Sequence, residues 1–167
     1  PFASYVVNNQ AKWTSKPGET QKAVLAYLIA KAASTDFGKD HNFQAIHSHH
    51  DFKRNVPIRD YEGLKPYVDK VVLGKPNVLW PGLPQYFAKT SGTTSGVKYI
   101  PISNDSIGHH INGARDALLN YVHQTGKSIF LDGKLIFLSG SPEMVKKNGV
   151  YVGRLSGIVN HHVPGYL

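Results

Sequence analysis

Thr90-Ser91-Gly92-Thr93-Thr94-Ser95-Gly96-Val97-Lys98 is the stretch of this sequence that indicates most about fold and function. Its two glycines let the backbone adopt positive φ and approach a ligand closely, and consecutive amide N–H groups in such a loop form an anion-binding concavity. The serine and threonine hydroxyls add donors that can rotate toward phosphate oxygens, and Lys98 adds a positive charge. The stretch therefore predicts a loop that binds the phosphates of a nucleotide.

The spacing of this loop differs from that of the Walker loop of kinases and GTPases. Three residues separate Gly92 from Gly96, whereas the Walker loop has four, and Val97 stands before Lys98. No G-x-G-x-x-G dinucleotide fingerprint is present either. An ordinary turn between two strands is the alternative interpretation. The density of threonine and the terminal lysine favour phosphate binding.

The residues on either side of the loop predict a mixed α/β fold, because strands alternate with helices. Residues 86–89 and 98–102 are typical of strands, and Ser103, Asn104 or Asp105 can cap a long helix that runs to about His123. Upstream, apolar residues recur at helical spacing from Ala23 to Ala32, and Thr35 to Gly38 is expected to end that helix, with Gly38 as a left-handed cap.

The remaining segments give weaker expectations. Residues 36–55 are polar and predict mostly loop, pinned to the core by Phe43, Ile46 and Phe52. Asp60 can cap a short helix, Pro66 suits the first turn of another, and Gly74 stops it. Residues 134–138 predict a buried strand, and residues 150–152 another.

Composition narrows the class of protein. With 41% hydrophobic and 18% charged residues, the 167-residue chain is long enough for one domain with a core. It has no cysteine, which excludes disulfides, thiolate metal sites and a cysteine nucleophile. No run approaches the roughly 18 apolar residues of a membrane span, and no secretory signal is present, so a cytoplasmic location is the default expectation.

Nineteen Lys and Arg residues against eleven Asp and Glu give a net charge of +8 with neutral histidines. This excess favours anionic partners in general, but the basic residues are scattered, so we expect no nucleic-acid partner. The chain lacks an initiating Met, and its end does not read as a natural terminus. We therefore expect residues 1–167 to form a single partial domain of a longer protein, possessing no C-terminal domain of its own.

Taken with its context, the loop resembles the phosphate-binding signature of adenylate-forming enzymes. A set of short segments along the chain, taken in sequence order, is similar to the N-terminal region of the Gretchen Hagen (auxin-responsive) acyl-acid amido synthetases, in a bacterial form. The resemblance covers most of the chain from about Trp13 to about Tyr121 and rests on the following segments: Trp13, a helix with Gln21, Thr35–Gly38, Val56-Pro57-Ile58-Arg59-Asp60-Tyr61-Glu62, Pro66-Tyr67, Thr90–Lys98 and Ile100-Pro101.

The resemblance implies a mixed α/β fold that is the incomplete N-terminal part of an adenylate-forming (acyl-adenylate synthetase-like) large domain. It implies a ligase that adenylates a small carboxylic acid with ATP and Mg²⁺ and then transfers the acyl group to the amine of an amino acid. Ser91, Thr94 and Lys98 would hold phosphate oxygens, Gly92 and Gly96 would permit close approach, and Thr90, Thr93 and Ser95 would line the same turn. No residue is assigned as catalytic, and the fragment alone is expected to be inactive.

Three alternatives to this function stay open. One is an acyl-CoA or aryl-CoA synthetase type of adenylating enzyme, and another is a nucleotide- or anion-binding module without catalysis. The third is a basic RNA-binding piece. A fragment of a larger domain would also expose apolar surface, so self-association is expected.

Three further groups of residues invite a functional interpretation. The family places an arginine near Arg115 to hold the substrate carboxylate, although a surface arginine paired with Asp116 is the alternative. The histidines of His47–Asp51, His109-His110 and His161-His162 are expected to be solvated or to cap helices, and no protein-bound metal site is predicted. Ser139-Gly140-Ser141 is expected either to line a ligand or to form an ordinary turn.

Overall fold

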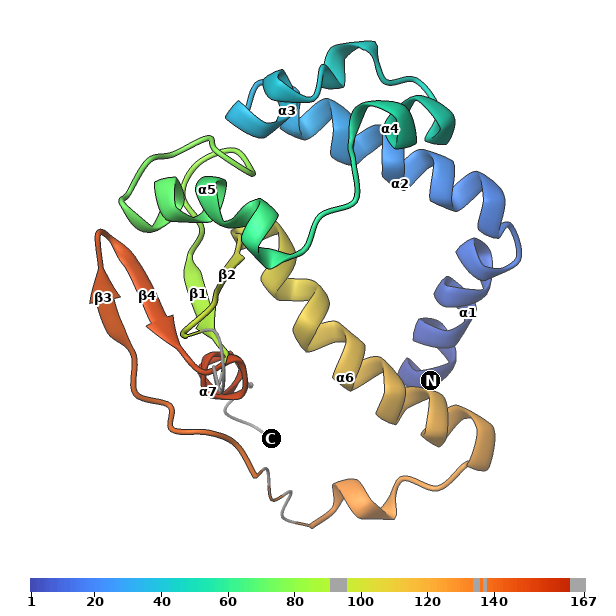
Figure 1. Ribbon diagram of the computed structural model, residues 1–167. Coiled ribbons are helices and arrows are strands. Elements are labelled where there is room, and N and C mark those ends of the chain that lie inside the picture. Colours follow the sequence, from blue (N-terminus) through green and yellow to red (C-terminus); the bar gives the residue numbers. More distant parts are fainter. Residues whose placement is uncertain (91–95, 134–135, 137, 163–167) are drawn as a thin grey trace.

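The computed structural model describes residues 1–90, 96–133, 136 and 138–162, and its architecture is mixed α/β, as the sequence predicts (Figure 1). A small sheet is packed between helices on both faces. The helices within residues 2–55 extend to one side of the sheet, and we refer to them as the helical arm. The elements in chain order are α1 (Phe2–Thr14), α2 (Pro17–Ala32), α3 (Asp36–Asp40), the 3₁₀ turn η1 (Phe43–Ala45), α4 (His49–Asn55), α5 (Tyr61–Val72), β1 (Tyr86–Lys89), β2 (Tyr99–Ile102), α6 (Asn104–Thr125), the 3₁₀ turn η2 (Ile129–Leu131), β3 (Val145–Lys147), β4 (Val150–Gly153) and α7 (Leu155–Asn160).

The four strands form one mixed sheet in the order β2-β1-β4-β3. β1 and β2 are antiparallel neighbours, as are β3 and β4, and the two hairpins are joined by parallel pairing of β1 with β4. The turn of the second hairpin is Asn148-Gly149, and both residues have positive φ (47° and 88°). An Asn-Gly pair of this kind suits a tight hairpin, because its backbone matches the twist of the strands.

Alternation along β1 divides the core into two layers, because successive side chains of a strand point to opposite faces. Phe87 is fully buried beneath the valines of α5, together with Val150 and Val152 of β4. Tyr86 and Ala88 face the other way and pack against the start of α6 and against α7. The sheet is therefore covered on both faces.

A third cluster holds the helical arm together. Ile29 and Ala32 of α2 pack on Phe43, the first residue of η1, and on Ile46, the residue that follows η1. α1 lies along the C-terminal part of α6 (Figure 1), where the Gln10 amide donates a hydrogen bond to Asp116 at 3.1 Å. Among the described residues, no helix combines the length and the apolar character needed to cross a bilayer.

Several sequence predictions are confirmed. Strands are present at β1, β2 and β4, the apolar stripe from Ala23 lies in α2, and the long helix after the loop is α6. Of its three candidate caps, Ser103 is the one used, because its side chain accepts a hydrogen bond from the Ser106 amide. Asp60 caps α5 in the same way through the Gly63 amide.

Other predictions are wrong. Gly38 is not a left-handed cap: α2 ends at Ala32, and Gly38 is buried inside α3, where a Cβ would overlap the Ala32 carbonyl oxygen. Position 38 requires glycine because the backbone of residue 32 packs closely against it, and not because the position has a positive φ. Residues 36–55 contain α3, η1 and α4 and are not mostly loop, because Thr35 and Ser48 each cap a short helix.

Two further expectations fail. Pro66 does not begin a second helix but lies within α5. Proline has no amide N–H, so the carbonyl of Glu62, four residues earlier, loses its helical hydrogen bond. The proline is tolerated because both residues are exposed and water can hydrogen-bond that carbonyl. The predicted buried strand at residues 134–138 is not found in its described part, since Ile136 and Leu138 are 86% and 100% exposed and belong to no strand.

Candidate functional site

The pairing of β1 with β2 brings the two ends of the predicted phosphate loop together. Lys89 stands opposite Tyr99 in the ladder, and one residue further the Thr90 amide donates a hydrogen bond to the Lys98 carbonyl at 3.1 Å. Gly96 has a φ of +80°, a conformation that glycine adopts at little cost. We refer to Thr90 and residues 96–98 as the loop neck. The other predicted loop residues lie outside the described part of the chain: Ser91, Gly92, Thr93, Thr94 and Ser95.

The loop neck is attached to α5 through Tyr61, the first residue of that helix. The Tyr61 hydroxyl accepts a hydrogen bond from the Tyr99 amide at 2.9 Å. The Lys98 ammonium nitrogen lies 5.2 Å from the centroid of the Tyr61 ring, within the range of a cation–π contact. One side chain therefore contacts both the lysine of the loop and the strand that follows it.

A second lysine, on β3, lies over the ring of the tyrosine that follows Lys98. The Lys147 ammonium nitrogen is 5.1 Å from the centroid of the Tyr99 ring, which in turn packs edge-on against Phe87. In the described ranges, no carboxylate oxygen comes within 4.0 Å of the ammonium group of Lys98 or Lys147. Each ammonium group lies over an aromatic ring with no carboxylate partner among the described residues, and each can therefore attract an anion.

The segment before α5 fixes the position of Tyr61. Asp60 caps the helix, and the preceding Arg59 donates a hydrogen bond to Nε2 of His41 at 2.7 Å. Because Arg is a donor only, Nε2 of His41 must accept, and the ring proton is on Nδ1, which donates to the Phe37 carbonyl at 2.7 Å. His41 is 5% exposed. The two hydrogen bonds fix the orientation of the ring, which joins α3 to the start of α5.

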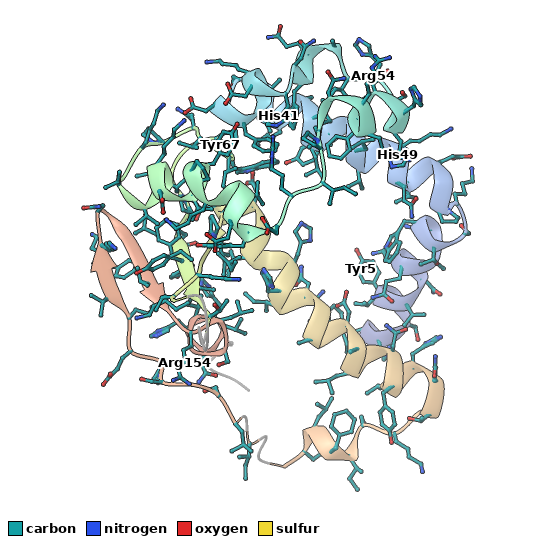
Figure 2. All side chains as sticks on the ribbon, viewed as in Figure 1. Tyr5, His41, His49, Arg54, Tyr67 and Arg154 are labelled. Atoms are coloured by element: carbon teal, nitrogen blue, oxygen red, sulfur yellow. The ribbon has the colours of Figure 1, made fainter. Side chains whose placement is uncertain are left out.

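Figure 2 shows that His41 and Tyr67 both lie between α3 and α5. The Tyr67 hydroxyl donates a hydrogen bond to Asp40 at 2.8 Å, and burial, followed by this bond to a carboxylate, raises the pKa of Tyr67 above its ordinary value. Sequence reasoning did not assign His41, Arg59, Tyr61 or Lys147 to the site. The only signal for any of them was the run of residues 56–62, which contains Arg59 and Tyr61.

Arg115 lies on α6 with its guanidinium turned to the adjacent Asp116. Its Nε and Nη2 donate to the same carboxylate oxygen at 2.8 and 2.7 Å. Asp116 also accepts a hydrogen bond from Gln10, so the pair is part of the contact between α1 and α6. A role for Arg115 in holding a substrate carboxylate remains a prediction from the resemblance.

The His-rich segment before α4 is a helix start. Ser48 accepts a hydrogen bond from the Asp51 amide at 3.1 Å, and the Asp51 carboxylate accepts from the Ser48 hydroxyl and the His47 amide. This reciprocal arrangement resembles a capping box, with the amide of His47 in place of the amide of the N-cap residue Ser48. It lowers the pKa of Asp51, chiefly through the Ser48 hydrogen bond. Within residues 1–90, 96–133, 136 and 138–162, no three His or acidic side chains are grouped as metal ligands.

Ser139-Gly140-Ser141 is fastened to α7. The Gly140 amide donates to the Ser156 hydroxyl at 2.9 Å, and Ser139 accepts a hydrogen bond from the Asn160 side chain at 3.0 Å. These groups are used within the protein, in contacts with α7. The possibility that it lines a ligand remains a prediction.

Comparison with known proteins places the chain in a family. Residues 6–163 match the family described as the GH3 family N-terminal domain. The sequence is 31% identical over 143 residues to indole-3-acetic acid-amido synthetase GH3.15 of Arabidopsis thaliana, covering 83% of this chain and 23% of that protein.

Solved structures agree on the fold. The structure of AtGH3.15 acyl acid amido synthetase in complex with 2,4-DB superimposes with a TM-score of 0.76 and 22% identity, over 90% of this chain and 26% of the other. A second structure, of GH3.15 acyl acid amido synthetase, gives the same TM-score with 20% identity, over 89% of this chain and 27% of the other. The chain thus spans about a quarter of the length of these relatives.

Proposed function

The chain belongs to the GH3 family, in which it corresponds to the N-terminal domain, and on that premise we propose that the complete gene product containing it is an acyl acid amido synthetase. In the first step, a carboxylate oxygen of a small acid attacks the α-phosphorus of ATP, and the bond to the β-phosphate breaks to release pyrophosphate. In the second, the amine of an amino acid attacks the acyl carbon, loses a proton, and displaces AMP to leave an amide.

The observation that carries this proposal is the loop neck. The hairpin is closed by the hydrogen bond from the Thr90 amide to the Lys98 carbonyl, and the Lys98 ammonium is uncompensated by any carboxylate of the described residues. A positive charge at the exit of a hydroxyl- and glycine-rich loop suits a polyphosphate. We assign the phosphate contacts to Ser91, Thr94 and Lys98, with Gly92 and Gly96 allowing close approach and Thr90, Thr93 and Ser95 lining the turn.

Mg²⁺ is part of the proposal, as the partner of the ATP phosphates. The described residues offer no grouped set of three acidic or histidine ligands, and Mg²⁺ commonly keeps several waters and binds through substrate phosphates. The donor set therefore fits an ion that arrives with ATP. When bound, the ion would neutralise phosphate charge beside Lys98.

The same proposal includes three finer points. Arg115 would hold the substrate carboxylate by leaving Asp116, to which it is hydrogen-bonded in this structure. The protein would belong to the adenylate-forming superfamily in a bacterial, cytoplasmic form. The chain would be one partial domain of that protein and inactive by itself.

ATP–pyrophosphate exchange by the complete gene product, across a panel of carboxylic acids, tests the proposal. We expect exchange with at least one acid, and its loss when Ser91→Ala and Lys98→Ala are combined. Lys146→Ala is the control, because Lys146 lies on a tyrosine ring of the sheet in a similar way but outside the loop neck. Undiminished exchange in the double variant would refute the assignment of the loop.

The acceptor separates the amido synthetase from a CoA-type enzyme. With the acid identified by exchange, we expect an amide product when amino acids are supplied and no thioester when coenzyme A is supplied instead. A thioester would favour an acyl-CoA or aryl-CoA synthetase, and nucleotide binding without exchange would favour a non-catalytic module.

A further inference from the structure

We propose that Tyr61 is a positioning residue for Lys98, which it holds at the loop neck without neutralising its charge. The inference rests on the proposed function, because the purpose of this positioning is contact with the phosphates of ATP. Tyr61 is distant in sequence from the loop, and it reaches it as the first residue of α5.

The aromatic ring provides the first contact. A lysine has a long flexible stem, so the ammonium loses side-chain entropy when a phosphate fixes it. The Tyr61 ring, 5.2 Å from the Lys98 nitrogen, restricts that stem before the ligand arrives. A carboxylate in the same place would hold the ammonium too, but it would compete with phosphate for the charge. The ring leaves the full positive charge available.

The hydroxyl group provides the second contact. β2 is an edge strand of the sheet. The Lys98 carbonyl points toward β1, where it accepts the Thr90 amide, so the amide of the next residue, Tyr99, points to the outer edge. The Tyr61 hydroxyl accepts that amide at 2.9 Å. The backbone that carries Lys98 is therefore fixed on both sides, by β1 and by Tyr61.

The contacts of Tyr61 can be separated by substitution. Tyr61→Phe keeps the ring beneath Lys98 and removes the acceptor of the Tyr99 amide, whereas Tyr61→Leu removes both. Tyr151→Leu is the matched control, because Tyr151 also lies against a lysine, with the Lys146 nitrogen 5.5 Å from its centroid, on a strand outside the loop neck.

A double-mutant cycle on ATP–pyrophosphate exchange tests the functional coupling. We expect Tyr61→Leu to lower kcat/KM for ATP by roughly three- to ten-fold, since a partly exposed cation–π contact corresponds to a factor of about two to five and one hydrogen bond adds to it. Tyr61→Phe should lose less, and Tyr151→Leu should stay within about two-fold of the unaltered enzyme. In a Lys98→Ala background, Tyr61→Leu should change kcat/KM by less than about two-fold, because residues that act through one another are not additive.

A second readout does not require activity. The rate at which an acylating reagent modifies Lys98 in the nucleotide-free complete gene product can be followed by mass spectrometry, with Lys146 as internal reference. We expect Tyr61→Leu to raise the rate at Lys98 about two- to five-fold and Tyr61→Phe to leave it unchanged.

The outcomes separate the two hypotheses. Additive losses in the cycle, or an unchanged modification rate in Tyr61→Leu, would overturn the role of Tyr61 while leaving the proposed function intact. Absence of exchange in the unaltered protein would overturn the proposed function, and the modification rates would still decide whether Tyr61 holds Lys98. A thermal unfolding midpoint for each variant shows whether it has folded, and Tyr61→Phe keeps the hypothesis testable if Tyr61→Leu does not fold.

Discussion

Gly38 and Gly113 both lie within helices, but the space around their Cα atoms differs. A Cβ on Gly38 would overlap the Ala32 carbonyl, whereas a Cβ on Gly113 of α6 would meet no atom within 4 Å. We expect Gly38→Ala to lower the free energy of unfolding by about 1–3 kcal/mol, as overpacking does. Gly113→Ala should raise it by roughly 0.5–1 kcal/mol, because alanine loses less backbone entropy in a helix. Urea unfolding of both variants measures this, and equal shifts of one sign would contradict the packing described for α3.

We expect the free energy of unfolding to depend on pH through the side chain of Asp36. The hydrogen bond from Lys75, at 2.6 Å, is the main cause that lowers the pKa of Asp36 below its ordinary 3.8, with the charges of Lys75 and Lys70 assisting. A group whose pKa is lower in the folded state stabilises the fold above its unfolded pKa. That contribution is lost as the pH falls through the folded pKa.

Asp36→Asn should remove this contribution. We expect the thermal midpoints of the variant and the unaltered chain to coincide near the acid end of a series from about pH 2 to pH 6, and to separate above about pH 4, where an unfolded aspartate is ionised. Melting curves followed by circular dichroism suffice. A constant gap at every pH would mean that the substitution acts through packing and not through charge.

At the residue scale, the sequence predicted the strands on either side of the loop, which are confirmed, but not the side chains that contact Lys98. Gly96 and Lys98 lie in one short stretch, and their residue types alone suggest phosphate binding. Tyr61 of α5 contacts Lys98, and Lys147 of β3 contacts the next residue, Tyr99, only because the fold brings distant segments together. No periodicity or local spacing contains that information.

At the scale of elements, α6 depends on both of its ends. The Ser103 side chain accepts the Ser106 amide, and Gly126, with φ of +68°, ends the helix in the left-handed region. Ser103→Ala should cost about 1 kcal/mol of unfolding free energy, as loss of an N-cap does. Ser128→Ala is a suitable control, because Ser128 precedes η2 without a side-chain capping bond. Denaturant midpoints of the two variants should therefore differ. Similar midpoints would show that the cap contributes little to α6.

Elements with strong local signals were predictable, and those without were not. α2, α6, β1 and β2 follow from apolar spacing, caps and the loop between the strands. α1 gave no such signal, because Val6 is its only residue classed as buried and its stability comes from contacts with α6. α3 and α4 have five and seven residues, too few for a helical period to be seen. The exposure of Ile136 and Leu138 could not be inferred, since a short apolar run in isolation reads as a core strand.

At the scale of the whole molecule, the helical arm leaves large apolar side chains in water. On α2, Val24, Tyr27 and Leu28 are 49%, 53% and 43% exposed, and Phe2, Tyr5 and Trp13 of α1 are exposed too. Exposed apolar groups on adjacent helices are typical of a surface that another surface covers. The net charge of +8 opposes contact between copies at low salt.

We therefore expect the 167-residue chain by itself to self-associate, and more strongly as salt screens the charge. Sedimentation velocity at low and high ionic strength, at several protein concentrations, measures this. Combined Val24→Ser and Leu28→Ser should weaken the association, whereas Ile58→Ser, at a fully exposed position outside the arm, should not. A sharp monomeric boundary at high concentration and high salt would contradict the expectation.

The parallel pairing of β1 with β4 has a consequence for synthesis of the protein. Roughly sixty residues separate Lys89 from Val150, so a ribosome adding about 5–20 residues per second needs on the order of 3–12 seconds to deliver the partner strand. During that interval the β1–β2 hairpin can form, but the second edge of β1 has nothing to pair with. An open strand edge invites pairing with other chains, so the nascent polypeptide is most vulnerable to aggregation, and most in need of a chaperone, in the seconds before β4 is made.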